Sequence, residues 1–411
     1  MRTVIHGGQV FDTTSGEFGA ADVVIEDEAI VDVGTDLRGD ESFDATGLSV
    51  LPGLIDTHVH VMAPYFDTVK LLETPFSLLF FYAEKILRET LDIGITHVRD
   101  ANGADLGVQT AVALGLIDGP DLDISIQALG QTGGHSDFWM ASGTCAPLLP
   151  THPGRPESVV DGADAMRLRV REVIRAGANV IKLNVSGGVI SPRGDPRNPQ
   201  LRVDEIDEAV AEATAAGIPV MAHAHSTQGI KNAVRAGVRS IEHGTYLDDE
   251  AIALMLEKGT WLVPTLGVAG ALLEGVANGA RMPDAVVAKL RQGRDAHLES
   301  VRRAIAAGVK IAMGSDAAAL GHGRNLIELR EMSALGLSDA DVLRSATSSA
   351  AALMGKTELL GSVRTGLRAD LTIVAGDPTD FAGYPANVAA VFKRGRLARH
   401  YPAVAAVQMG G

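Results

Sequence analysis

Residues 51–60 read Leu-Pro-Gly-Leu-Ile-Asp-Thr-His-Val-His, so an apolar run ends in two histidines that a single residue separates. On an extended strand the side chains of residues i and i+2 point to the same side. His58 and His60 can therefore present two imidazoles to one ion, and imidazole is a good ligand for zinc and similar divalent metals. Because histidine pairs also occur on ordinary surfaces, the interpretation depends on the rest of the chain.

Four further candidate ligands lie within or at the end of short apolar segments downstream: Lys182, His223, His243 and Asp316. Each segment is strand-like in length and composition. A helical stretch that stops at a glycine precedes each of them, and glycine is favoured just past a helix C-terminus because it accepts the left-handed conformation. These glycines are Gly177, Gly217, Gly237 and Gly308.

A parallel α/β architecture follows from this alternation of helix, glycine and strand. Eight strands are expected, near residues 52–58, 94–100, 121–129, 178–185, 218–223, 238–243, 260–265 and 309–316. Eight strands with intervening helices fit a (β/α)8 TIM barrel, in which the chemistry takes place at the C-terminal ends of the strands. The six candidate ligands all lie at or near such ends, which favours a functional role for them.

Both ends of the chain differ from its middle. Residues 1–52 and 361–411 contain short β-rich runs and no convincing helix. We expect the two ends to form one small β-sandwich domain and residues 53–360 to form the barrel. Two long Gly- and Pro-rich connections, 131–162 and 186–202, follow the third and fourth strands, where loops usually shape the pocket of a barrel.

The composition limits the classes of partner. A net charge of −15 argues against nucleic acid or an anionic membrane, since both need basic patches. The single cysteine, Cys145, excludes an intrachain disulfide framework and a cysteine-rich metal site. No apolar run at the start marks export, and the apolar patch 77–82 is too short to span a bilayer. We expect a cytoplasmic protein that forms a homo-oligomer, the common default for such barrels.

The arrangement of candidate ligands resembles the amidohydrolase superfamily, which has His-x-His on strand one, Lys on strand four, His on strands five and six, and Asp on strand eight. The resemblance covers essentially the whole chain. Four segments are similar to the imidazolonepropionase-like branch, which contains prolidase-like and carboxypeptidase-like enzymes and ochratoxin-hydrolysing amidases. They are Gly-Gly-His-Ser-Asp-Phe-Trp (133–139), Ala-His-Ala-His (222–225), Ser-Ile-Glu-His-Gly-Thr (240–245) and Gly-Ser-Asp (314–316). The resemblance implies a metal-dependent hydrolase.

Two divalent metal ions, with zinc as the expected metal, are part of what the resemblance implies. His58, His60 and Asp316 would hold one ion, and His223 and His243 would hold the other.

Lys182 needs a separate explanation, because a lysine ammonium cannot ligate a cation. Burying it uncompensated costs on the order of several kcal/mol. The resemblance implies that carbon dioxide carbamylates this side chain to N6-carboxylysine, whose carboxylate bridges the two ions. The alternative is a lysine on an edge strand that reaches solvent. The neighbours Ile181 and Leu183 disfavour that alternative, since buried lysine is rare and needs a reason.

A water that bridges two metals loses a proton near neutral pH and becomes a nucleophile. We expect Asp316 to accept a proton from this bridging hydroxide during attack and to deliver it to the leaving nitrogen, as general base and acid. The alternative for Asp316 is a helix N-cap. The predicted function is hydrolysis of the amide bond of an N-acyl amino acid, or of a dipeptide at its C-terminal residue.

Three residues are candidates for contact with that small-molecule substrate. His135 could bind a substrate carbonyl or carboxylate, or it could stabilise its own loop. His225 faces the same side as His223, so it could touch substrate or bond to a ligand histidine. Tyr246 could donate to an oxyanion or a carboxylate.

Three other functions stay open from the sequence. The first is a cyclic-amide hydrolase or deaminase, which Lys182 disfavours. The second is hydrolysis of a phosphotriester, lactone or carbamate at the same site. The third is a non-catalytic barrel, which the presence of all six candidate ligands disfavours. The sequence assigns no role to a further set of polar residues: Asp100, Asp137, Arg193, Arg197, His322 and Arg324.

Overall fold

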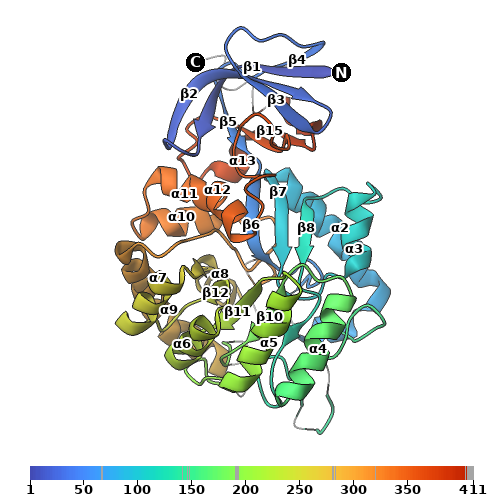
Figure 1. Cartoon of the computed structure of the whole chain (residues 1–411), viewed down its shortest axis with the longest axis vertical. Coiled ribbons are helices and arrows are strands. Elements are labelled where there is room, and N and C mark those ends of the chain that lie inside the picture. The colour runs from blue at the N-terminus through green and yellow to red at the C-terminus, as the bar shows by residue number, and fades with distance from the viewer. Residues whose placement is uncertain are drawn as a thin grey trace.

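The computed structural model has two parts stacked along the long axis of the molecule (Figure 1). A sheet built from both ends of the chain forms one part, and parallel strands with helices around them form the other. The structure describes residues 1–65, 68–140, 142–145, 147, 149–189, 194–279, 282, 284–319, 321–402 and 404.

Strands from the two ends of the chain form one eight-stranded sheet, in the order β16-β15-β14-β5-β1-β2-β3 with β4 paired to β1. Their bounds are β1 (Arg2–Asp12), β2 (Glu17–Glu26), β3 (Ala29–Gly34), β4 (Glu41–Asp44), β5 (Leu48–Pro52), β14 (Leu371–Ala375), β15 (Val388–Lys393) and β16 (Arg396–His400). The central strands β5 and β14 run antiparallel, with Leu371 opposite Pro52. Both are buried along their whole length, which fits their apolar sequences.

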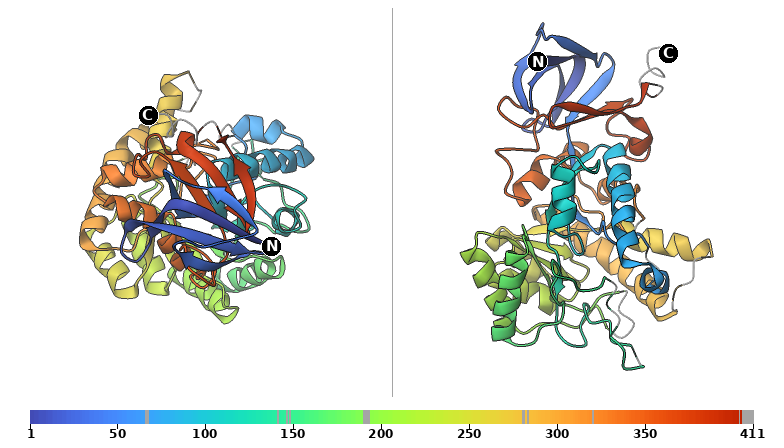
Figure 2. Two further views of the ribbon diagram at one scale, coloured as in Figure 1. Left: turned by 90° about the horizontal axis from the view of Figure 1, so that it is seen from above. Right: turned by 90° about the vertical axis from the view of Figure 1, so that its right-hand side faces the viewer.

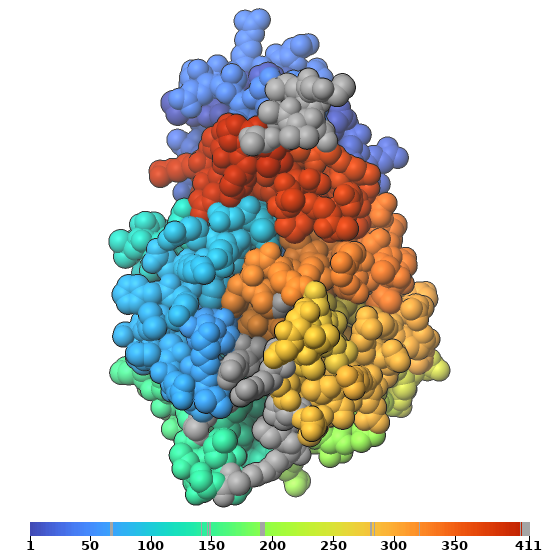
Figure 3. All heavy atoms as spheres, turned by 180° about the vertical axis from the view of Figure 1, so that it is seen from behind, coloured from blue at the N-terminus to red at the C-terminus, as the bar shows by residue number. Residues whose placement is uncertain are grey.

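Strands from both ends of the chain therefore belong to one sheet. Two further views show the strands of both termini together (Figure 2), and the space-filling view shows their atoms at one end of the molecule (Figure 3). The sandwich arrangement and the division of the chain into 1–52 with 361–411 and 53–360 stay predictions.

Two parallel sheets form the centre of the other part. One contains β6, β7 and β8, and the other contains β9 to β13. Their bounds are β6 (Leu54–Val59), β7 (Ile95–Asp100), β8 (Asp121–Ile124), β9 (Ala128–Leu129), β10 (Ile181–Asn184), β11 (Val220–Ala224), β12 (Ser240–His243) and β13 (Trp261–Val263). These strands lie where the first seven strands are predicted, and residues 121–129 supply one strand to each sheet.

The eighth predicted strand, near residues 309–316, is not a regular strand. This segment makes isolated parallel bridges instead, from Ile311 to Leu262 of β13 and from Ala317 to Val59 of β6. A Cβ atom at Gly314 would lie 2.3 Å from the Val263 side chain, so only glycine permits this close approach. Asp316 then takes a left-handed backbone conformation, with a φ of 55°, which ends the extended ladder. The segment nevertheless lies between the two parallel sheets.

Helices surround the parallel strands in Figures 1 and 2. Their bounds are α1 (Thr68–Glu73), α2 (Phe76–Asp92), α3 (Leu106–Ala113), α4 (Ala163–Arg175), α5 (Val203–Ala215), α6 (Thr227–Ala236), α7 (Asp249–Lys258), α8 (Gly267–Ala277), α9 (Asp284–Ala307), α10 (Ile327–Ala334), α11 (Asp339–Ser345), α12 (Ser348–Leu353) and α13 (Tyr384–Asn387). Within the described ranges, none of them has the length and apolar character needed to cross a membrane.

Local capping explains where the helices between strands start and stop. Ser226 and Asp248 accept hydrogen bonds from backbone N–H groups of the first turns of α6 and α7. Gly237 and Gly259 end the same helices with φ values of 99° and 65°. Gly177, Gly217 and Gly308 also have positive φ, so the predicted role of these glycines is confirmed.

A buried ion cluster joins the terminal sheet to the parallel strands. The carboxylate of Asp121, on β8, lies 2.7 Å from Arg368 Nη1 and 2.8 Å from Lys393 Nζ. Arg394 Nη2 lies 3.0 Å from the same group. The two parts of the molecule are therefore connected by matched charges in addition to apolar packing.

Candidate active site

The predicted ligands lie in two adjoining groups at the C-terminal ends of the parallel strands. His58, His60 and Asp316 form one group, and their potential ligand atoms lie within 4.8 Å of one another. His223 and His243 form the second group together with His225, within the same distance. The ring centroids of His58 and His243 are 5.3 Å apart, so the two groups are in contact.

Lys182, on β10, is buried beside both groups with only 3% of its surface exposed. Within the part of the chain that the structure describes, its Nζ atom has no hydrogen-bond partner. Burial lowers the pKa of Lys182 to about 8, although the charges of Glu242 and Asp316 oppose this shift. A buried amine without a partner is an exception in proteins that calls for an explanation.

Hydrogen bonds fix the rings of the first group. His58 donates from Nδ1 to Glu242 Oε2 at 2.6 Å, and its Nε2 lies 3.8 Å from Asp316 Oδ1. His60 Nε2 lies 3.1 Å from the same Asp316 oxygen. Burial would raise the pKa of Asp316, but the hydrogen bond from His60 and the charge of His58 outweigh it and hold that pKa below its usual range. Asp316 is thus a carboxylate that faces both histidines.

The second group is held by hydroxyl groups. His243 Nδ1 is hydrogen-bonded to Thr265 Oγ1 at 2.7 Å, and His225 Nδ1 is hydrogen-bonded to Thr245 Oγ1 at the same distance. The His225 and His243 rings stack with centroids 4.8 Å apart. His225, predicted only as a substrate or supporting residue, therefore belongs to the histidine cluster itself. His243 has a φ of 73°, an uncommon conformation for a residue other than glycine that often marks functional sites.

His135 reaches the same cluster from the loop after β9. Its ring stacks on His223 with a centroid separation of 4.3 Å and an interplanar angle of 13°. A Cβ atom at Gly188 would lie 2.0 Å from His135 Cε1, so the backbone of this glycine provides the space for the ring. Burial, and next the charge of Lys182, lower the pKa of His135 to about 4. His135 therefore lies against the histidine cluster, and its role in substrate binding stays a prediction.

Tyr246 lies at the edge of the cluster. Its backbone N–H donates to the carbonyl of His225 at 3.0 Å. Burial raises the pKa of its hydroxyl, and the charges of Arg197 and Asp195 act on it in opposite directions. Tyr246 is therefore close to the loop that follows β10.

The polar residues without a predicted role mainly organise loops. Asp100 accepts hydrogen bonds from the backbone N–H groups of Val61, Asn102 and Ala104, and so fixes the loop that follows His60. Arg193 lies outside the described residues. The other contacts are Asp137 with Gly133 N (2.8 Å) and Trp139 N (3.2 Å), Arg197 with Asp195 (2.7 Å), His322 Nε2 with Ala63 O (2.9 Å) and Arg324 with Glu274 (2.9 Å).

Sequence reasoning missed the charged pair Glu242 and Arg99. Glu242 is fully buried and supports His58, and Arg99 Nη2 donates to it at 3.0 Å. The available signal was a charged residue inside an otherwise strand-like run, because such residues are rarely buried unless they are paired.

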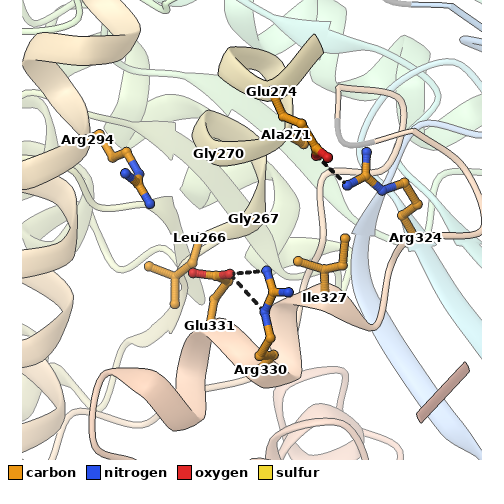
Figure 4. Close-up of a pocket in the computed structure, with 10 residues that line it drawn as sticks. All are labelled: Leu266, Gly267, Gly270, Ala271, Glu274, Arg294, Arg324, Ile327, Arg330 and Glu331. Atoms are coloured by element: carbon orange, nitrogen blue, oxygen red, sulfur yellow. Dashed lines mark hydrogen bonds and ion pairs between the residues drawn. The ribbon is translucent and has the colours of Figure 1, made fainter. Parts of the chain in front are cut away.

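A separate cleft of about 310 Å³ lies between α8, α9 and α10 (Figure 4). Its charged side chains include the ion pairs Arg324–Glu274 and Arg330–Glu331. Among the described residues, its lining contains none of the predicted ligands.

Comparison with known proteins gives the family. The amidohydrolase family pattern matches residues 49–398. The chain belongs to the amidohydrolase family. Ochratoxinase from Aspergillus niger is 32% identical in an alignment that covers 96% of this chain and 86% of that protein. The chain is therefore an enzyme that hydrolyses an amide bond.

Two solved structures place it further in the ochratoxinase and prolidase-like branch of this superfamily. A prolidase complexed with N-methylphosphonate-L-proline has a TM-score of 0.89 and 38% identity, covering 98% of this chain and 100% of that one. A Xaa-Pro dipeptidase with methionine in its active site has a TM-score of 0.89 and 31% identity, with the same coverage. Amidohydrolases have a TIM-barrel-type fold and generally use divalent metals, and the histidine-rich groups fit the second property.

Proposed function

We propose that this chain is a binuclear metal-dependent hydrolase that releases an amino acid from an N-acyl amino acid or from the C-terminal end of a dipeptide. The observation that carries the proposal is the environment of Lys182. Its buried Nζ has no hydrogen-bond partner among the described residues. After burial, its charge is one of the causes that lower the pKa values of His58, His223 and His243. A bridging anion at this position would join the two groups of ligands.

The donor set fits two divalent ions. His58, His60 and Asp316 would hold one, and His223 and His243 the other, with imidazole and carboxylate donors that suit zinc. Lys182 would bridge them as N6-carboxylysine, since carbamylation replaces an ammonium that has no hydrogen-bond partner among the described residues by a carboxylate. When bound, the ions would polarise the substrate carbonyl and lower the pKa of a water molecule.

The protein side chains would supply proton transfer and binding. Asp316 would accept a proton at Oδ from the attacking water and return it to the leaving nitrogen. His135, which stacks on His223, and Tyr246 would bind the carbonyl or the carboxylate of the substrate. Thr245 is hydrogen-bonded to Nδ1 of His225, so His225 would form a hydrogen bond to the substrate through its other ring nitrogen, Nε2.

The relatives support the substrate class. A prolidase with a proline-containing phosphonate and a Xaa-Pro dipeptidase both act on bonds to an amino acid, and both cover nearly the whole chain. We therefore place an amino acid in the leaving group.

We also propose that the parallel strands close into a (β/α)8 barrel. The bridges Ile311–Leu262 and Ala317–Val59 support closure, because they connect β13 to β6 through the eighth segment. The native metal, a homo-oligomeric state and a cytoplasmic location stay predictions.

The test is turnover of the zinc-loaded protein on a panel of N-acyl amino acids and dipeptides, with lactones, phosphotriesters and cyclic amides alongside. Metal stoichiometry is measured on the same sample. We expect two ions per chain and release of a free amino acid. If activity were confined to esters, phosphotriesters or cyclic amides, the proposed metal site would stand but the proposed substrate class would be wrong.

A further inference from the structure

A buried ion pair lies within the parallel strands next to His58. Glu242, on β12, is fully buried, and Arg99, on β7, is 3% exposed. The interiors of barrels are usually filled by branched apolar side chains. A buried ion pair is seldom more stabilising than apolar residues of the same volume. Stability alone is therefore a weak explanation for this pair.

Several partners hold the Glu242 carboxylate in one orientation. Oε2 accepts from His58 Nδ1 at 2.6 Å. Oε1 accepts from Arg99 Nη2 at 3.0 Å and from Ser240 Oγ at 2.5 Å. Both oxygens are thus bonded, and one of them bonds directly to a predicted metal ligand.

Arg99 connects the same network to the backbone of the strand that carries His58. Its Nε donates to the carbonyl of Thr57 at 2.6 Å, and Nη1 lies 3.3 Å from Ser240 Oγ. Arg99 therefore fixes the residue before His58 and the carboxylate behind its ring at the same time. Three strands, β6, β7 and β12, meet in this network.

The consequence for His58 follows from its two ring nitrogens. Because Nδ1 donates to Glu242, Nε2 must carry the lone pair, and Nε2 is the nitrogen that faces Asp316. The Nδ1 partners of two other ligand histidines are neutral: Thr265 Oγ1 for His243 and the Asn102 carbonyl for His60. A carboxylate behind a histidine fixes its tautomer and raises its basicity as a ligand.

We propose that Glu242, with Arg99 as its counter-charge, is a positioning residue that sets the tautomer and ligand strength of His58. It thereby controls how tightly the ion of the His58–His60–Asp316 group is held. This inference rests on one part of the proposed function, namely that His58, His60 and Asp316 bind a metal ion.

The test measures metal affinity without relying on turnover. Metal-free wild type and Glu242→Gln are titrated with Zn²⁺ against a chromophoric chelator, and with Co²⁺ by visible absorption. Glutamine keeps the size of the side chain and an acceptor for Nδ1–H but removes the charge. We expect affinity for one of the two ions to fall about 10–100-fold, with a changed Co²⁺ spectrum and unchanged affinity for the other ion.

Two further variants separate this role from a structural one. Glu208→Gln removes a surface carboxylate that pairs with Arg167 and should leave both affinities unchanged. Ser240→Ala removes one hydrogen bond to Glu242 but keeps the charge of Glu242. It should therefore lower the affinity for the same ion by a smaller factor. This variant keeps the test valid if Glu242→Gln folds poorly. The unfolding midpoint of each metal-free protein is measured in parallel.

The outcomes are distinct. The positioning role would be overturned if folded Glu242→Gln or Ser240→Ala kept its Zn²⁺ affinity and showed only a lower unfolding midpoint. That result would leave the proposed function intact. A wild-type protein that binds no metal would overturn the proposed function itself.

Discussion

Two buried clusters of charged side chains differ in how their charges are matched. Around Asp121, at the joint with the terminal sheet, three cationic side chains place a nitrogen within 3.0 Å of one carboxylate. In the candidate active site, Lys182 is at least as buried, yet among the described residues its Nζ has no hydrogen-bond partner. The Asp121 cluster therefore has its counter-charges within the protein.

The pKa shifts of the two clusters show the same difference in how burial is compensated. Burial alone would raise the pKa of Asp121, but Arg368 and Lys393 outweigh it and hold that pKa well below its usual range. In the site, burial prevails and lowers the pKa of Lys182 to about 8. Charged partners surround the carboxylate of Asp121, whereas the candidate active site contains a buried amine for which the described residues supply no partner. A buried titratable group with a perturbed pKa often marks a functional site.

Replacing Lys182 by alanine tests the incomplete cluster and has the largest expected effect. We expect turnover to be abolished and metal to be lost, because the substitution removes the side chain that we propose as the bridging ligand. Metal content and amino acid release are measured against Lys85→Ala, which removes an exposed lysine of α2 that pairs with Glu89. Two tightly bound ions in Lys182→Ala would contradict the bridging role.

Asp316→Asn removes the proposed proton acceptor while keeping the size of the side chain. We expect kcat to fall about 10²–10⁴-fold, the usual contribution of a general acid–base group. Asp164→Asn, at an exposed position of α4, is the matched control. Full activity in Asp316→Asn would remove this residue from the chemistry.

Asp121→Asn breaks the matched cluster. Removing one partner of a buried ion pair leaves uncompensated charge, so the free energy of unfolding should fall by about 3–5 kcal/mol. Because the cluster lies at the joint with the terminal sheet, kcat and metal affinity of the folded protein should not change. Urea denaturation and zinc titration measure the two quantities. A loss of metal affinity without a loss of stability would reverse the distinction between the clusters.

Gly188→Ala tests how closely the site is packed. A Cβ atom there would displace the His135 ring, so kcat/KM should fall roughly 10-fold to 10²-fold with metal content unchanged. Gly19→Ala, on β2, adds a methyl group where no atom lies within 4 Å and is the control. Loss of metal in Gly188→Ala would show that His135 is not mainly a substrate-binding residue.

The pH dependence of stability gives the smallest expected effect. The pKa of Asp121 in the folded protein lies below its unfolded value of about 3.9. Its stabilising contribution is therefore present above that value and is lost as the pH falls through the folded pKa. In metal-free protein, the stability difference between wild type and Asp121→Asn should be constant from about pH 7 to pH 5 and shrink below about pH 4. A difference that does not change with pH would contradict this account.

The sequence predicted what local patterns determine. Helix ends at Gly217 and Gly237 depend on a left-handed backbone that glycine accepts, and the first seven strands follow apolar runs. The eighth strand was predicted as regular, but Gly314 and the left-handed Asp316 interrupt it. Its contacts with two distant strands depend on tertiary packing that periodicity does not encode.

The predicted ligands lie together because residues at the ends of parallel strands meet at one edge. The Glu242–Arg99 pair could not be predicted in the same way, since its partners come from three strands that are far apart in sequence. For His225, the spacing from His223 indicated the correct face, but the stack on His243 depends on side-chain packing between neighbouring strands.

We propose that Lys182 joins two metal ions as a carbamylated side chain. The most direct measurement is ¹³C NMR of the protein reconstituted with zinc in ¹³C-bicarbonate, with metal counted in the same sample. We expect two ions per chain and a carbamate carbon signal that disappears in Lys182→Arg. Two ions without that signal would contradict the proposal.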